Sequence, residues 1–350
     1  MVLVLATPLQ AAPRADPPRD TTSAGPGYVP ALIPGAGSIN GIACPGAGRC
    51  VAVGLGAPGL AVVSNNWGRT WRRVSTLRTV FGLAAVSCPS LSDCVAVGMS
   101  TNNGAVALYS RDGGLKWRLG GLPRDMYRLE TVACADATEC VASGTVGNAE
   151  LPLILRTVDA GARWTAASGG ARCLEFAGLT CPTVRECIGV GNGDGAGLVD
   201  RSLDGGELWT TTQLGREFPT LLQVSCTTAK WCVTVGQYQS LTYPFLRGGI
   251  GVTTDSGETW TFRRGPLASS IVLRAVTCQR DLCVAVGDNN SVLQVAKSTD
   301  GGRIWKRLAP TLKGNFVGLS ISFSRDSEYL VGGTLNAGRK GFILRSTSGA

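Results

Sequence analysis

The sequence predicts an all-β protein: a seven-bladed β-propeller of four-stranded antiparallel blades, closed by an N-terminal outer strand. A cysteine pair, a glycine and a box ending in tryptophan follow one another six times, and a seventh, degenerate copy ends the 350-residue chain. The glycines recur every 44 to 51 residues, which is a period typical of blades and also of helical solenoids. The segments beside them are too short for helices and rich in small and β-branched residues, so they indicate strands. These glycines are Gly54, Gly98, Gly144, Gly191, Gly236, Gly287 and Gly333.

The second copy shows the order of elements within one repeat. Residues 82–88 form the first expected strand, which ends at Cys88, and the second begins at Cys94. A third strand runs into the box at 110–117, and a fourth starts at Trp117. Four antiparallel strands repeated radially make a propeller blade.

The N-terminal segment 28–33 is expected to complete the last blade. The final repeat stops inside its box, so it lacks a fourth strand. Residues 28–33 stand before the first cysteine pair, where other repeats carry a strand led by tryptophan. Pro30 has no N–H for a ladder, which suits an outermost strand.

The chain divides into two regions by composition. Residues 1–26 are expected to be a signal-peptide-like segment and a disordered spacer, because an apolar start is followed by a stretch rich in Pro, Asp, Thr and Gly. Residues 27–350 form the propeller. We therefore expect a secreted, periplasmic or otherwise extracellular protein. No later apolar stretch is long enough to span a bilayer.

Twelve of the 13 cysteines form six local pairs, each between the end of a first strand and the start of a second. Neighbouring antiparallel strands can meet disulfide geometry, so the pairs predict six disulfides. Metal sites and reduced, buried thiols are the alternatives, but a chain without histidine makes poor zinc sites. We expect no metal and no cofactor, and Cys173 is left over. The pairs are Cys44/Cys50, Cys88/Cys94, Cys134/Cys140, Cys181/Cys187, Cys226/Cys232 and Cys278/Cys283.

The box Ser/Thr-x-Asp-x-Gly-x-x-Trp is the most specific motif. Its carboxylate can accept backbone N–H bonds, its glycines allow positive φ, and its tryptophan fills the space between blades. The motif resembles the Asp-box (BNR) repeat of sialidases, sortilin-type receptors, some endoglucanases and photosystem II assembly-factor propellers. The resemblance implies that these aspartates build turns away from the active face. They are Asp112, Asp159, Asp204, Asp255 and Asp300, and the first copy has Asn66 instead.

The absence of histidine excludes histidine-based triads and acid–base catalysis. The enzyme alternative is a carbohydrate-active glycoside hydrolase, sialidase-like or endoglucanase-like. Tyr28-Val29-Pro30-Ala31-Leu32 resembles a sialidase motif, but it lacks the arginine that binds the substrate carboxylate in that family. Two carboxylates would be needed for hydrolysis, and the weak candidates are Glu130, Glu175 and Asp288.

Propellers usually bind at the face formed by the loops that join fourth to first and second to third strands. The insertion at 237–247, which explains the 51-residue step, belongs to this face and carries aromatic and basic side chains typical of binding sites. The alternative is a solvated loop whose hydrophobic side chains only anchor it to the fold. The ligand-binding candidates are Arg128, Arg172, Tyr238, Tyr243, Phe245, Arg247 and Arg274.

The formal net charge is +9, yet no long run of Lys or Arg occurs. This argues against nucleic acid as a partner. We expect a monomeric binding or scaffold module that recognises a glycan, a cell-wall polymer or a protein partner. A structural, surface-attached protein is a further alternative.

Overall fold

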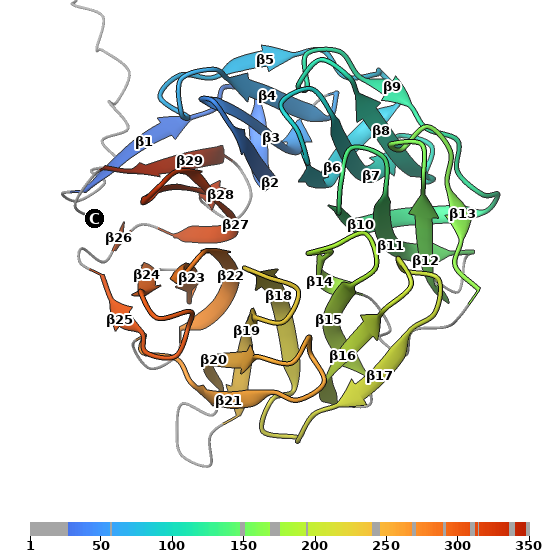
Figure 1. Cartoon of the computed structure of the whole chain (residues 1–350). Coiled ribbons are helices and arrows are strands. Elements are labelled where there is room, and N and C mark those ends of the chain that lie inside the picture. Colours follow the sequence, from blue (N-terminus) through green and yellow to red (C-terminus); the bar gives the residue numbers. More distant parts are fainter. Residues whose placement is uncertain are drawn as a thin grey trace, which may run out of the picture.

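The computed structural model is a ring of antiparallel sheets around a central axis (Figure 1). It describes residues 27–56, 58–147, 151–168, 176–193, 195–239, 246–267, 271–289, 292–308, 312–313, 315–335 and 340–347. Within these ranges every regular element is a strand. In each sheet the first strand of the repeat lies nearest the axis, and later strands lie further out. The β-propeller class predicted from the sequence is therefore confirmed.

Five sheets each contain one repeat. Three of them have four strands in chain order. They are β10 (Met126–Cys134), β11 (Cys140–Val146), β12 (Leu151–Thr157) and β13 (Thr165–Ala166); β14 (Phe176–Thr180), β15 (Cys187–Gly193), β16 (Ala196–Ser202) and β17 (Thr210–Gln213); and β18 (Thr220–Cys226), β19 (Cys232–Gln239), β20 (Leu246–Thr253) and β21 (Thr261–Arg264). A fourth sheet has five strands, because two short strands pair with different parts of its third strand. It contains β22 (Val272–Gln279), β23 (Leu282–Asp288), β24 (Val292–Ser298), β25 (Lys306–Arg307) and β26 (Leu312–Lys313).

The fifth sheet joins the two ends of the described chain. It runs in the order β1 (Tyr28–Leu32), β29 (Lys340–Ser346), β28 (Glu328–Leu335) and β27 (Phe316–Arg325). Strand β1 pairs with β29 from Tyr28↔Ser346 to Leu32↔Phe342. The buried hydroxyls of Tyr28 and Tyr329 lie 2.7 Å apart, which fixes β1 against β28 as well.

The prediction of seven separate four-stranded blades is wrong in its blade count. Only five sheets stand as single units, and the remaining eight strands form one continuous sheet. The cause is one residue pair, Leu55↔Gly82, which joins the second strand of one repeat to the first strand of the next. This sheet contains β2 (Ala36–Gly46), β3 (Arg49–Gly56), β4 (Leu60–Ser64), β5 (Arg72–Val74), β6 (Val80–Ser87), β7 (Cys94–Ser100), β8 (Ala105–Ser110) and β9 (Arg118–Leu119).

The apolar core lies between neighbouring repeats. The second and third strands supply fully buried valine, leucine, isoleucine and alanine on both of their faces. Because each sheet is covered by its neighbours on two sides, these strands read as nearly continuous apolar runs rather than alternating patterns.

The six predicted disulfides are present, each within the hairpin between a first and a second strand. Their Cα–Cα distances lie between 3.9 and 4.1 Å. Cys173 lies outside the described residues. Disulfides persist in oxidising environments, so the pairs favour an extracellular or otherwise oxidising compartment. No helix among the described residues is long and apolar enough to cross a membrane.

The second cysteine of each pair also lies deep in the fold. Cys50 bonds to Cys44 and Cys283 to Cys278, and the side chains of both Cys50 and Cys283 are 0% exposed. Each belongs to an apolar core between repeats, as does the equally buried Cys232. The sequence does not indicate this burial, because a hairpin end is usually solvated. These cysteines therefore stabilise the ring, and a ligand cannot reach them.

The box builds a turn between the third and fourth strands, as the copy at 202–209 shows. The Ser202 hydroxyl donates to Asp204 Oδ1 at 2.8 Å and accepts the Gly206 N–H at 2.8 Å. Asp204 Oδ1 also accepts the Leu208 N–H at 3.0 Å. Trp209 Nε1 donates to the Gly206 carbonyl at 2.9 Å, which satisfies its buried N–H. Equivalent carboxylate bonds occur at Asp112, Asp159, Asp255 and Asp300, and the Asn66 amide oxygen does the same.

Candidate functional site

Every innermost strand contains a β-bulge at the same place. In β10, Leu129 pairs with Gly144 and Thr131 with Ser143, so Glu130 has no opposite residue in the ladder. A bulge of this kind re-aims a side chain and is frequent beside functional sites. Six other inner strands repeat it, four residues before the first cysteine or its equivalent. The bulged residues are Asn40, Ala84, Glu130, Ala177, Leu222, Arg274 and Leu319.

The recurring glycine of the second strand makes room for this bulge. A Cβ placed on Gly98 would lie 2.2 Å from the Gly82 carbonyl oxygen, and one on Gly144 would lie 2.0 Å from that of Arg128. Such contacts are far inside van der Waals distance. The glycine that marks the repeat in the sequence is therefore required by close backbone approach.

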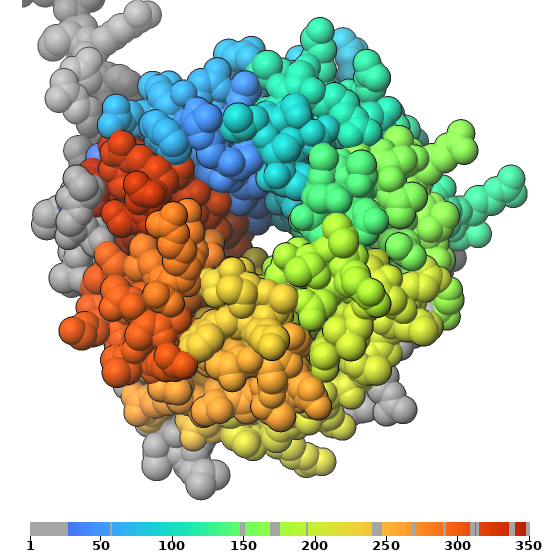
Figure 2. Space-filling view, viewed as in Figure 1, coloured from blue at the N-terminus to red at the C-terminus, as the bar shows by residue number. Residues whose placement is uncertain are grey.

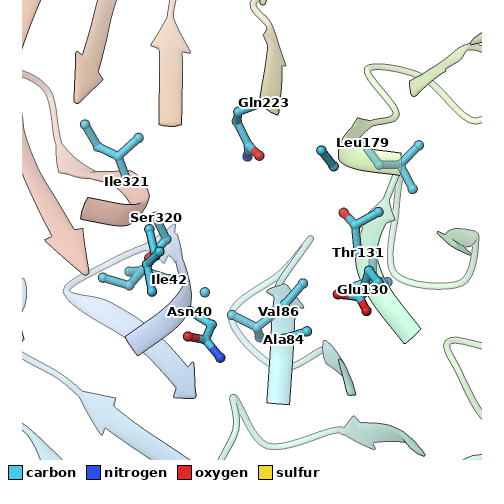
Figure 3. A pocket seen from close by; sticks show the side chains of 15 residues that line it. Asn40, Ile42, Ala84, Val86, Glu130, Thr131, Leu179, Gln223, Ser320 and Ile321 are labelled. Carbon is cyan, nitrogen blue, oxygen red and sulfur yellow. The ribbon is translucent and has the colours of Figure 1, made fainter. Parts of the chain in front are cut away.

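The inner strands surround an axial channel, which appears as the central hollow in Figure 2. A cavity of about 350 Å³ lies within it, lined by the inner strands of several repeats. Figure 3 shows Thr131, Gln223, Ser320 and the bulged Asn40 arranged around this space. The Ser320 side chain is 9% exposed, and its hydroxyl has no hydrogen-bond partner within the described part of the chain. The channel wall combines small and aliphatic residues with a few polar side chains.

The channel opens at the end where inner strands begin and second strands end. We call this opening the channel mouth and define it by Asn40, Leu55, Phe81, Arg128 and Glu130, which line a second cavity of about 130 Å³. Asn40 and Glu130 line both cavities, so the mouth adjoins the channel. Phe81 is 57% exposed, which is unusual for so large an apolar ring.

Ion pairs hold the charged groups of the inner strands. Arg128 Nε lies 2.8 Å from Glu130 Oε1, and both side chains are about one third exposed. Arg274, a bulged residue, places Nε 2.6 Å from Asp288 Oδ2, and the Asp288 side chain is fully buried. Both described carboxylates among the weak catalytic candidates are therefore held by an arginine.

The other candidates are only partly described. Tyr238 and Arg247 are opposite each other in the β19–β20 ladder, so this part of the insertion extends a hairpin. The Tyr238 ring packs 5.4 Å from the ring of Phe218. The structure brings Arg128 together with Glu130, Arg274 with Asp288, and Tyr238 with Arg247, on three different sheets. Arg172, Glu175, Tyr243 and Phe245 lie outside the described residues.

Sequence reasoning missed the bulge, and with it Asn40 and Phe81. The signal was present, because the bulged residue stands four positions before the first cysteine in six repeats. Pattern reading cannot distinguish a bulged strand from a regular one when the residue after the bulge is small. Among the described residues, no group of three or more cysteine, aspartate or glutamate side chains is placed to hold a metal ion.

No family model matches the chain, and neither does any curated protein. Its fold is nevertheless similar to solved structures. The structure titled "YCF48 bound to D1 peptide" superposes with a TM-score of 0.68 at 17% identity, covering 92% of this chain and 97% of that one. YCF48 from Cyanidioschyzon merolae gives 0.67 at 16% identity, covering 91% and 98%. The GH74 xyloglucanase from Xanthomonas campestris gives 0.62 at 14% identity, covering 88% and 52%. At these identities the likeness shows a shared β-propeller fold and no more.

Proposed function

We propose that this chain is an Asp-box propeller that works as an exported binding module and recognises a protein partner at its channel mouth. The observation that carries the proposal is the set of bulges, because five of the bulged residues line the channel: Asn40, Ala84, Glu130, Ala177 and Leu319. A structural ring would not need Asn40 and Glu130 at positions where other repeats carry alanine or leucine.

A protein partner fits the mouth better than a glycan. Phe81 is 57% exposed and Leu55 is 39% exposed. Both lie beside the Arg128–Glu130 ion pair. Apolar anchors bordered by charged groups are the pattern of protein-binding hot spots. The similar structure titled "YCF48 bound to D1 peptide" supports this choice by analogy of fold.

The glycoside hydrolase is the weaker alternative. Hydrolysis needs one carboxyl group as an acid and a second as a base or nucleophile. Asp288 is fully buried beside Arg274, and Glu130 is paired with Arg128. The two carboxylates belong to different sheets, and each is engaged by its own arginine.

Peptide and glycan arrays probed with the whole chain test the proposal. We expect peptide ligands whose binding is weakened by Phe81→Ser and by the pair Arg128→Gln with Glu130→Gln. Leu91→Ser is the matched control, because Leu91 is 49% exposed in the hairpin at the other end of the same strand, β6. Equal loss in the control, or glycan binding accompanied by hydrolysis that requires Glu130, would overturn the proposal.

A further inference from the structure

A separate cavity, also of about 350 Å³, lies where the chain passes from strand β1 into β2. We use the word seam for such a junction, where the loop from one sheet to the next meets a box. The segment Leu32–Pro34 forms one wall, and Val62 with Trp71 of the first box forms the other. None of the residues that line this cavity lines the channel or its mouth. Ligand binding here would therefore be independent of the proposed function.

This seam closes differently from the one that follows β9. There, Gly121 donates its N–H to the Ala162 carbonyl and accepts the Trp164 N–H, at 2.8 and 2.9 Å. Those bonds draw the connecting loop onto the next box, and Trp164 is only 4% exposed. At the first seam, Ile33 instead donates to the Gly341 carbonyl of its own sheet at 3.2 Å. Trp71 is consequently left half-buried beside open space.

The cavity is positively charged. Arg69 and Arg73 line it, and none of the nine lining residues is acidic. Arg73 is held in place by a bond from Nη2 to the Pro58 carbonyl at 3.1 Å. The neighbouring carboxylate, Glu328, is bound by Arg325 and lies 3.5 Å from Arg345 Nη1, and the charge of Arg69 also helps to lower its pKa.

We propose that this seam pocket binds a small aromatic carboxylate. An arginine guanidinium matches a carboxylate in charge and in its pair of donors, and two arginines stand at this pocket. The Trp71 ring and the apolar wall of Leu32 and Ile33 suit a flat apolar body. The volume is at the lower end of the range for small-molecule sites, so the ligand is limited to about two fused rings.

Calorimetric titration of the whole chain with 2-naphthoate and its neutral amide, 2-naphthamide, tests the charge requirement. We expect a dissociation constant for the acid below about 1 mM. The amide should bind at least about tenfold more weakly, because it cannot pair with the guanidinium groups. This comparison uses the unaltered chain, so it does not depend on the folding of a variant. Equal affinities for acid and amide, or no heat from the acid at 10-fold that concentration, about 10 mM, would overturn the proposal.

The double variant Arg69→Gln with Arg73→Gln locates the site. Both side chains are exposed, so we expect the fold to survive and the affinity for 2-naphthoate to fall about tenfold or more. Arg163→Gln is the control, since Arg163 is also exposed and belongs to the box at the closed seam. Unchanged affinity in the double variant, or an equal loss in the control, would move the binding away from this seam.

Discussion

Close backbone contact decides which glycines this fold requires. Gly98 and Gly104 belong to the same repeat and differ in this respect. A Cβ on Gly98 would lie 2.2 Å from a carbonyl oxygen, whereas one on Gly104 would have no neighbour closer than 3.6 Å. The first supports the bulge at Ala84, and the second only joins two strands.

Substituting these two glycines separates a steric requirement from a general effect of glycine loss. Gly98→Ala should lower the free energy of unfolding by about 2–3 kcal/mol, because the backbone of β6 must move. Gly104→Ala should change it by less than about 0.5 kcal/mol. Urea unfolding of both variants checks this expectation, and similar losses in the two would show that the bulge needs no glycine.

The box aspartates make stability depend on acid. Burial disfavours the charged form of Asp255, but bonds from the Thr259 hydroxyl and N–H and from Thr253 outweigh it and lower its pKa from 3.8 to about 2. The folded-state pKa lies below the unfolded one, so the carboxylate stabilises the fold above pH 3.8 and this contribution is lost as the pH falls toward 2. The same direction of pKa shift holds at Asp112, Asp159, Asp204 and Asp300.

Asp255→Asn should therefore cost stability near pH 5 and progressively less as the pH is lowered to about 2. The measurement is the difference in free energy of unfolding between wild type and variant at several pH values. A difference that does not change with pH would mean that folding does not lower the pKa of Asp255.

At the scale of elements, the cysteine hairpins are the most predictable part of the molecule. Two cysteines about six residues apart, flanked by β-branched segments, specify a hairpin and its crosslink together. The full burial of Cys50 and Cys283 was not predictable, because it depends on the neighbouring repeat that covers each hairpin. The ladder Tyr238↔Arg247 within the insertion likewise depends on cross-strand pairing rather than on local residue preferences.

Removing one crosslink tests how much these hairpins contribute. Cys88→Ala with Cys94→Ala should lower the free energy of unfolding by about 2 kcal/mol, the chain-entropy value for so short a loop. Because both side chains are replaced, no unpaired thiol complicates the result. Thermal unfolding at two scan rates provides the measurement, and a neutral outcome would mean that the strand pairing alone fixes the hairpin.

In the molecule as a whole, contacts between repeats determine the features of the fold that could not be predicted from the sequence. The period predicted the repeated units, but one pair, Leu55↔Gly82, merges two of them into a single sheet. Which residues face the channel likewise depends on the ring as a whole. The candidate carboxylates Glu130 and Asp288 illustrate this, because their arginine partners become apparent only when the strands are assembled.

Strand β1 provides the test of how the two chain ends support the ring. A chain beginning at Gly27 keeps β1 and should melt at the same temperature as the full chain. A chain beginning at Pro34 loses the ladder with β29 and the Tyr28–Tyr329 bond, so its melting temperature should fall sharply. Equal melting temperatures for the two truncations would show that the β29 edge needs no partner.

We propose that the channel mouth is the binding surface of this ring. Hydrogen–deuterium exchange, with and without a peptide selected from the array, tests it most directly. We predict slower exchange on binding at the beginnings of the inner strands, in peptides covering 80–84 and 126–130. The box turns at 110–117 and 202–209 should be unchanged, because they lie at the other end of the strands. Protection confined to the box turns or the cysteine hairpins would contradict the claim.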